Sequence, residues 1–186
     1  MEYAAGSKIL TPFVTEYLGR YGSGRVVKAV FISSVTPFLL RTADNPGGVD
    51  RAVFDEMVAA MIVDRPSYLS AFLRDYYNLD LYGGNRVSAE IVQLGWNIAV
   101  QASAKASIDV VSAWMTDFRP DLAKLDVPTL VVHGSTDRIL PIEATGDRLH
   151  QALPGSQYAV IEGGPHGLLW THANEVDAAL LTFLAH

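Results

Sequence analysis

TLVVHGSTD at residues 129–137 and YAVIEGGPHG at residues 158–167 are the two stretches that decide the fold. Each begins with a short β-branched run and ends in a polar turn with glycine, which is typical of a buried strand that enters a loop. Helical periodicity at residues 142–153 and 174–185 adds a helix after each strand. Alternating strands and helices predict a parallel sheet with right-handed crossovers, the α/β class.

The residues upstream add one more strand and a long helical segment. The run VKAVFISS at residues 27–34 suits a buried strand. A helix is expected at 11–21, and four more at 50–63, 66–77, 88–99 and 107–116, with a polar break at 79–86. We expect one domain, residues 1–186, with about three parallel strands, flanking helices and an all-helical insertion at residues 50–118.

The composition excludes several classes of function. The net charge of −6 disfavours nucleic acid and anionic membranes, which need a basic face. There is no cysteine for a disulfide or a thiolate metal site, and no apolar run is long enough to cross a bilayer. The start, MEYAAGSKIL, lacks the basic and apolar regions of a signal peptide. We expect a cytoplasmic protein with neither a nucleic-acid nor a membrane partner.

Asp137 and His166 are the candidate site residues. Each follows a predicted strand, and the carboxyl ends of parallel strands are where α/β folds build their sites. A carboxylate there can hold an imidazole in one tautomer while the imidazole takes a proton from a nucleophile. Taken singly, such an Asp usually caps a turn and such a His usually packs or is solvated. The pair, in this order and on this pattern, indicates catalytic ancestry.

The other candidate residues give weaker evidence of a functional site. The turn G-x-S-x-G, which presents the serine of an α/β-hydrolase, occurs nowhere in the chain. Ser33 and Ser34 end a strand without that turn and are assigned to packing. The remaining histidines form no zinc pattern, so no metal is expected. We predict that His133 is structural, that His172 caps or packs near the last helix, and that His150 and His186 are solvated. Five side chains could line an apolar acyl pocket or belong to plain core: Phe38, Trp96, Trp114, Leu168 and Trp170.

Five motifs together resemble one family. They are YGSGRVVKAV, PFLLRTADNPGGV, DYYN, DFRPDLAKLDVPTLVVHGSTDRILPIEAT and PHGLLWTHANEVDAALLTFLA. They resemble the cofactor-free bacterial haloperoxidases, also called perhydrolases or arylesterases, of the α/β-hydrolase superfamily. The resemblance covers the chain from about Tyr17 to its C-terminus, and its motifs are specific.

The resemblance implies a Ser–Asp–His triad that forms an acyl-enzyme without metal, haem or other cofactor. The acyl group passes to water, or to hydrogen peroxide to give a peracid that oxidises halide. By motif position, Asp137 is the triad acid and His166 the triad base. The helices between Asp50 and Phe118 match the family's cap, which narrows the entrance over the site.

The start of the chain departs from the family's pattern. The nucleophile turn should fall near residues 6–10, which read GSKIL. Lys8 stands where the serine belongs, Leu10 stands where a glycine allows the turn, and Ser7 is one position away. The family's early strands and both oxyanion donors have no counterpart here. We therefore expect a truncated α/β-hydrolase domain that keeps the acid and base without the nucleophile.

Three functions stay open. The first is the C-terminal part of a haloperoxidase or esterase, inactive alone, that forms a homo-oligomer through the exposed sheet edge near Val27–Ser34. The second is an active esterase or perhydrolase with a rebuilt nucleophile, Ser7 or Lys8, or one completed by another chain. The third is a non-catalytic assembly or binding module that keeps the apolar pocket for a small acyl ligand.

Overall fold

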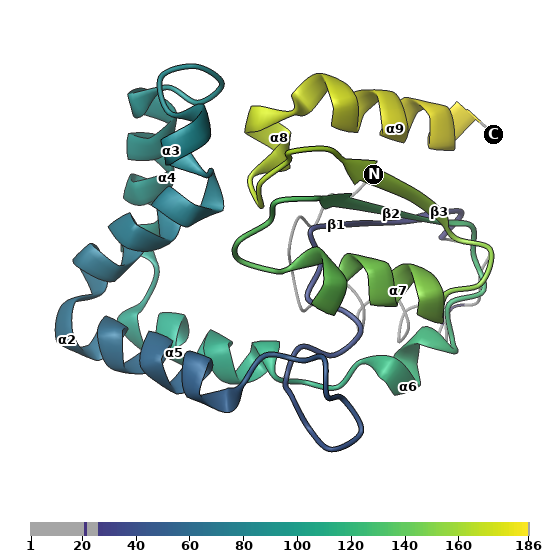
Figure 1. The fold of residues 1–186 in the computed structure, drawn as a ribbon, viewed down its shortest axis with the longest axis horizontal. Coiled ribbons are helices and arrows are strands. Elements are labelled where there is room, and N and C mark those ends of the chain that lie inside the picture. Colours follow the sequence, from purple (N-terminus) through teal and green to yellow (C-terminus); the bar gives the residue numbers. More distant parts are fainter. Residues whose placement is uncertain (1–20, 22–25, 186) are drawn as a thin grey trace.

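A three-stranded parallel sheet forms the centre of the molecule (Figure 1). The structure is a computed structural model and describes Tyr21 and residues 26–185. The strands are β1 (Ala29–Ile32), β2 (Thr129–Gly134) and β3 (Gln157–Ile161), in the order β1-β2-β3. Both neighbouring pairs are parallel. The predicted α/β class with about three parallel strands is therefore confirmed.

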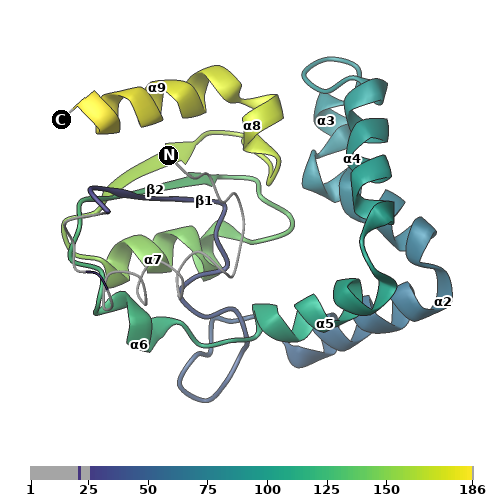
Figure 2. The same ribbon diagram turned by 180° about the vertical axis from the view of Figure 1, so that it is seen from behind.

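Helices cover both faces of this sheet, and so β2 is buried along its whole length. Leu130 and Val132 face one layer, which contains α9 (Ala173–Ala185), while Val131 faces the other, which contains α7 (Gly146–Ala152). Figures 1 and 2 show α9 and α7 on opposite sides of the strands. The alternation of side chains along a strand thus divides one continuous β-branched run between two apolar layers.

A helical cap is inserted between β1 and β2 and extends away from the sheet (Figures 1 and 2). It comprises α2 (Arg51–Tyr76), α3 (Leu79–Tyr82), α4 (Ala89–Gln101) and α5 (Ala104–Trp114). No strand is assigned to this segment. The structure thus has the predicted cap insertion, while the boundaries 50 and 118 stay a prediction.

The predicted helix boundaries in the cap are correct in some places and wrong in others. A kink at Asp64 divides α2, as the prediction of separate helices before and after Pro66 requires. Ser88 caps α4 by accepting a hydrogen bond from the backbone N–H of Ile91. Asp50 occupies the N-cap position of α2 as predicted, but its side chain forms no capping hydrogen bond and its carboxylate pairs with Arg41 at 2.8 Å. The break expected at 79–86 contains α3, and α5 begins three residues before the predicted 107.

The helix predicted at 142–153 is interrupted. A short 3-10 turn, η2 (Ile142–Ala144), precedes α7, and Thr145 between them has φ −130° and ψ −83°. Two four-residue helices were not predicted: α6 (Arg119–Leu122) before β2, and α8 (Leu168–Thr171) before α9. The helix predicted at 11–21 lies outside the described residues apart from Tyr21, and Ser7, Lys8 and His186 lie outside them as well.

The cap joins the core through an apolar base and a polar junction. At the base, Phe54, Val111 and Phe118 pack with Leu140 and Ala144 from the core side. At the junction, Asn78 donates to the backbone oxygen of Thr136, and the hydroxyl of Tyr82 donates to the backbone oxygen of Gly163. Cap side chains are thereby tied directly to the loops that follow β2 and β3.

Candidate active site

The loop after β2 begins at a glycine that the fold requires. A side chain at Gly134 would place its Cβ 2.1 Å from the backbone oxygen of Gly164. Without that side chain, the loops after β2 and β3 approach closely enough for Ser135 N–H to donate to the Ile161 oxygen and Thr136 N–H to the Gly164 oxygen. The chain then turns, and Asp137 N–H bonds back to Gly134. This turn directs Asp137 toward the next loop.

The loop after β3 is held from the same side. Gly163 has φ +71°, which a residue with a side chain rarely adopts. Its N–H donates to the hydroxyl of Ser135, and its oxygen accepts from the hydroxyl of Thr136. These two hydrogen bonds hold the loop after β3 against the turn after β2, so His166 lies beside Asp137.

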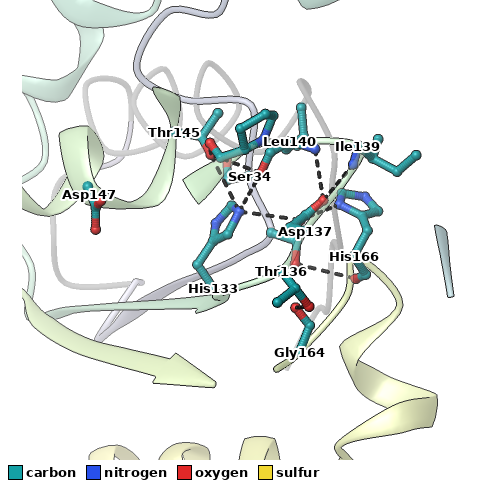
Figure 3. Close-up of polar contacts among 12 residues, drawn as sticks. Ser34, His133, Thr136, Asp137, Ile139, Leu140, Thr145, Asp147, Gly164 and His166 are labelled. Carbon is teal, nitrogen blue, oxygen red and sulfur yellow. Dashed lines mark hydrogen bonds and ion pairs between the residues drawn. The ribbon is translucent and has the colours of Figure 1, made fainter. Parts of the chain in front are cut away.

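Asp137 and His166 form a direct pair (Figure 3). His166 Nδ1 lies 2.8 Å from Asp137 Oδ2. The other carboxylate oxygen, Oδ1, accepts the backbone N–H groups of Ile139 at 2.9 Å and Leu140 at 2.8 Å. The carboxylate is therefore fixed on both oxygens. Because Oδ2 accepts from Nδ1, the proton of a neutral His166 lies on Nδ1, and Nε2 is left with a lone pair.

The surroundings keep Asp137 ionised. Burial by itself would raise the pKa of this carboxyl, which is only 5% exposed. Hydrogen bonds from His133 and His166, with the backbone N–H of Leu140, outweigh burial and hold the pKa well below its usual range. The acid is thus a carboxylate throughout the neutral range, as orienting an imidazole requires.

His166 lines a cavity of about 380 Å³ between the cap and the loops. No described residue forms a hydrogen bond with its Nε2. The ring of Tyr76, from α2, lies edge-on to the imidazole with the ring centres 5.0 Å apart. Burial, with smaller contributions from Tyr77 and Asp137, raises the pKa of Tyr76 to about 12, so this phenol stays protonated. The walls are mainly apolar and include Leu39, Phe54, Met57, Phe72 and Trp114.

Two of the five proposed pocket residues, Trp114 and Leu168, line this cavity. The other three lie elsewhere. Phe38 is buried beneath the guanidinium of Arg119, Trp96 lies in the cap with its indole N–H on the Pro66 oxygen, and Trp170 is 51% exposed. Periodicity could not separate these cases, because it shows that a side chain is apolar without showing which cavity it meets.

Ser33 and Ser34, which follow β1, form no hydrogen bond with His166 Nε2. Ser33 donates to the backbone oxygen of His166 at 3.4 Å, and Ser34 bonds to Thr36. His172 is buried directly before α9, where its ring packs edge-on against Tyr82. His150, predicted to be solvated, is half-buried: it bonds to Ser156 and stacks on Tyr158. Among the described residues, no group of His, Asp and Glu could hold a metal ion.

His133 is the residue whose position sequence reasoning missed. It is buried at the end of β2, and its Nε2 lies 2.9 Å from the Leu140 oxygen and 3.3 Å from Asp137 Oδ2. The assignment to a structural role leaves out this contact with the acid. The only signal in the sequence is the four-residue spacing in HGSTD, which gives no direction to the ring.

The family model for the alpha/beta hydrolase fold matches residues 11–173. The chain belongs to the α/β-hydrolase fold family. A putative non-heme chloroperoxidase from Synechocystis is 52% identical over 96% of this chain and 65% of its own length. A bifunctional esterase/perhydrolase from Acinetobacter calcoaceticus is 34% identical over 92% of this chain and 62% of its own. The crystal structure of a bromoperoxidase from Bacillus anthracis is 38% identical, with a TM-score of 0.88, over 97% of this chain and 66% of that one.

These matches confirm the resemblance to the haloperoxidase and esterase group of α/β-hydrolases. The chain spans about two thirds of the length of the relatives it matches. None of the helices in the described residues combines the length and apolarity that crossing a bilayer requires.

Proposed function

We propose that Asp137 and His166 are the acid and base of a serine-hydrolase triad of the haloperoxidase and esterase type. The observation that carries this proposal is the buried, ionised Asp137 on His166 Nδ1, with the opposite nitrogen unpaired among the described residues in an apolar cavity. In this role His166 Nε2 takes the proton of a nucleophilic hydroxyl as it attacks an ester carbonyl, and then returns it to the leaving alcohol. Asp137 keeps its charge throughout.

The cavity supports a small acyl substrate. Its apolar walls and its size suit a short acyl or aryl group, which gains by leaving water. The protonated hydroxyl of Tyr76 adds a hydrogen-bond donor beside the base. The cap would then act as it does in the family, by limiting which groups reach His166.

For the 186 residues by themselves, we propose that no serine-based triad is complete. The test is labelling of the purified chain with a fluorophosphonate, which reacts with an activated serine. We expect no stoichiometric labelling and no turnover of a short-chain aryl ester. Rapid labelling at Ser7 that is lost in Ser7→Ala would instead establish the rebuilt esterase, and restored turnover on adding a second chain would establish completion by a partner.

The triad roles are tested in whichever form turns over. Asp137→Asn leaves the geometry in place but favours the wrong imidazole tautomer, and we expect kcat to fall by about 10⁴-fold. Asp147→Asn is the matched control, because that carboxylate, on α7, binds the hydroxyl of Tyr158 instead of His166. Equal losses in the two variants would count against the proposed acid. Ligand binding without turnover in any form would favour the non-catalytic binding module.

We also propose that the isolated chain self-associates through the outer edge of β1. Within the described residues, β1 pairs only with β2. Ala29 and Ser33 donate toward β2, so the N–H groups of Val30 and Ile32 face the other edge, where they can pair with a second copy. A two-fold axis perpendicular to the sheet would make that junction antiparallel, giving six strands.

Light scattering tests this association at tens of micromolar. We expect a dimer that Val30→Pro dissociates, because proline removes an outward N–H but no bond to β2. Val30→Ala loses comparable packing and should remain dimeric. A monomeric wild type would refute the proposal.

A cytoplasmic location likewise remains a prediction, to be checked by cell fractionation.

A further inference from the structure

The acid of the pair has two imidazole neighbours on one oxygen atom. Asp137 Oδ2 lies 2.8 Å from His166 Nδ1 and 3.3 Å from His133 Nε2, as Figure 3 shows. The role proposed above uses only the first of these contacts. The second comes from His133 near the end of β2, which does not line the cavity.

The proton on His133 can be placed from its neighbours. Nε2 faces the Leu140 backbone oxygen at 2.9 Å and the Asp137 carboxylate at 3.3 Å, and neither of these groups can donate. The hydroxyl of Thr145, at 3.4 Å, donates to the Pro141 oxygen at 2.9 Å. Nε2 must therefore carry hydrogen, which is directed at the Leu140 oxygen, with Asp137 Oδ2 beside it at 3.3 Å.

The imidazole of His133 is also fixed in place. It is 1% exposed, and Gly146, the first residue of α7, packs against it so closely that a Cβ there would lie 2.8 Å from the ring. The ring therefore has little space in which to turn. Packing of the core therefore keeps His133 in contact with Asp137.

We propose that His133 is a positioning residue that sets how strongly Asp137 holds His166. By placing a polar N–H 3.3 Å from Oδ2, it stabilises part of the carboxylate charge and weakens the bond to His166 Nδ1–H. Its hydrogen bond to the Leu140 backbone oxygen also holds in place the loop whose Ile139 and Leu140 N–H groups bond to Asp137 Oδ1. The role rests on the proposed function, since it affects catalysis only if His166 is the base.

The groups around the pair do not compete for Oδ2. Tyr76 faces His166 from α2 as a neutral phenol. Arg138 lines the same cavity, but its guanidinium forms a two-point ion pair with Asp80. On α7, the Asp147 carboxylate accepts from Tyr158. His133 is therefore the group whose removal changes the charge available to His166 most directly.

NMR of histidine-labelled full chain provides the test. In the wild type, we expect the nitrogen spectrum to show His133 protonated at Nε2. In His133→Leu, the Nδ1 proton of His166 should move downfield, because Asp137 then serves one imidazole alone. In His133→Gln, whose amide can reach the same oxygens, that proton should return toward its wild-type position. His150→Gln, which alters a ring bound to Ser156 and Tyr158, is the control and should leave it unmoved.

The outcomes separate a positioning role from a merely structural one. If His133 only fills space, His133→Leu would loosen the loop, and the His166 proton would move upfield or disappear through exchange. That result, or a bare Nε2 on His133 in the wild type, would overturn the proposal. Should His133→Leu fail to fold, the wild-type protonation state and the His133→Gln shift decide it. A downfield shift in His133→Leu, found together with equal losses of turnover in Asp137→Asn and Asp147→Asn, would leave the coupling standing and refute the proposed triad role alone.

Discussion

The sheet core and the helical cap are stabilised in different ways. Every residue of β2 is buried, whereas α4 contains no buried residue at all. Large apolar side chains are exposed along the cap, with Ile62 at 68%, Val63 at 85% and Ile98 at 64%. The core is therefore held by apolar contacts distant in sequence, and the cap mainly by its own helices, its base and a few polar contacts.

This difference explains where the parts of the site lie. His133 is on β2, and Asp137 and His166 are on the loops after β2 and β3, where packing and hydrogen bonds fix their side chains. The cavity wall formed by Tyr76 and its neighbours comes from the cap, where local opening costs less. The proposed acid and base thus lie on the more buried part of the molecule, and the cavity wall beside them comes from the less buried one.

The largest effect is expected from Gly134→Ala in the core. The new Cβ would meet the oxygen and carbon of Gly164, and backbone atoms cannot move aside as a side chain can. We expect a loss of more than about 3 kcal/mol in the free energy of unfolding, above the usual cost of overpacking. Gly47→Ala is the control, since nothing lies within 4 Å of a Cβ there. Denaturant unfolding measures both, and equal midpoints would contradict the close approach of the two loops.

A matched truncation compares the two regions directly. Leu149, on α7, is fully buried against the sheet, and Leu149→Ala should cost about 3 kcal/mol through lost burial and the cavity left behind. Ile62→Ala in the cap should change stability by less than about 0.5 kcal/mol, because most of that side chain is already in water. Comparable losses of stability in Leu149→Ala and Ile62→Ala would mean that Ile62 is packed against another surface in solution.

A smaller effect is expected from pH. The pKa of Asp137 is lower in the folded chain than in the unfolded one, so its stabilising contribution is complete above the unfolded value of about 4 and is lost as the pH falls below it. The stability difference between wild type and Asp137→Asn should therefore shrink between pH 6 and about pH 3. In the cap, the hydrogen bond from Arg138 lowers the pKa of Asp80, but that group is fully exposed, and Asp80→Asn should show a much weaker pH dependence.

The sequence was sufficient for features that depend on local pattern. The strands were predictable because their β-branched runs are short and bounded by turns, and the kink in α2 because proline cannot continue a helix at Pro66. Asp137 and His166 could be paired because the ends of adjacent parallel strands meet at one edge. Each of these inferences needs only the chain order and the direction of the strands.

Features that depend on distant partners were not predictable. Asp50 stands at the N-cap of α2, but its carboxylate pairs with Arg41, nine residues earlier in the chain, and makes no capping hydrogen bond. The apolar pattern continues through 142–153, yet the chain breaks at Thr145, whose hydroxyl reaches the Pro141 oxygen beside His133. His133 itself faces the acid only because the turn after β2 folds back over its ring. None of these contacts produces a regular spacing of residue types that could be recognised in the sequence.

The ion pair of Arg138 makes entry to the cavity and alignment of the acid interdependent. Arg138 follows Asp137 directly in the chain, and its guanidinium binds both carboxylate oxygens of Asp80 on α3, at 2.7 and 3.0 Å. Any outward swing of the cap that separates α3 from the core must break this pair or pull on the backbone next to the acid. By linkage, a ligand that steadies the carboxylate would also favour the closed cap, and a ligand that props the cap open would disturb the carboxylate.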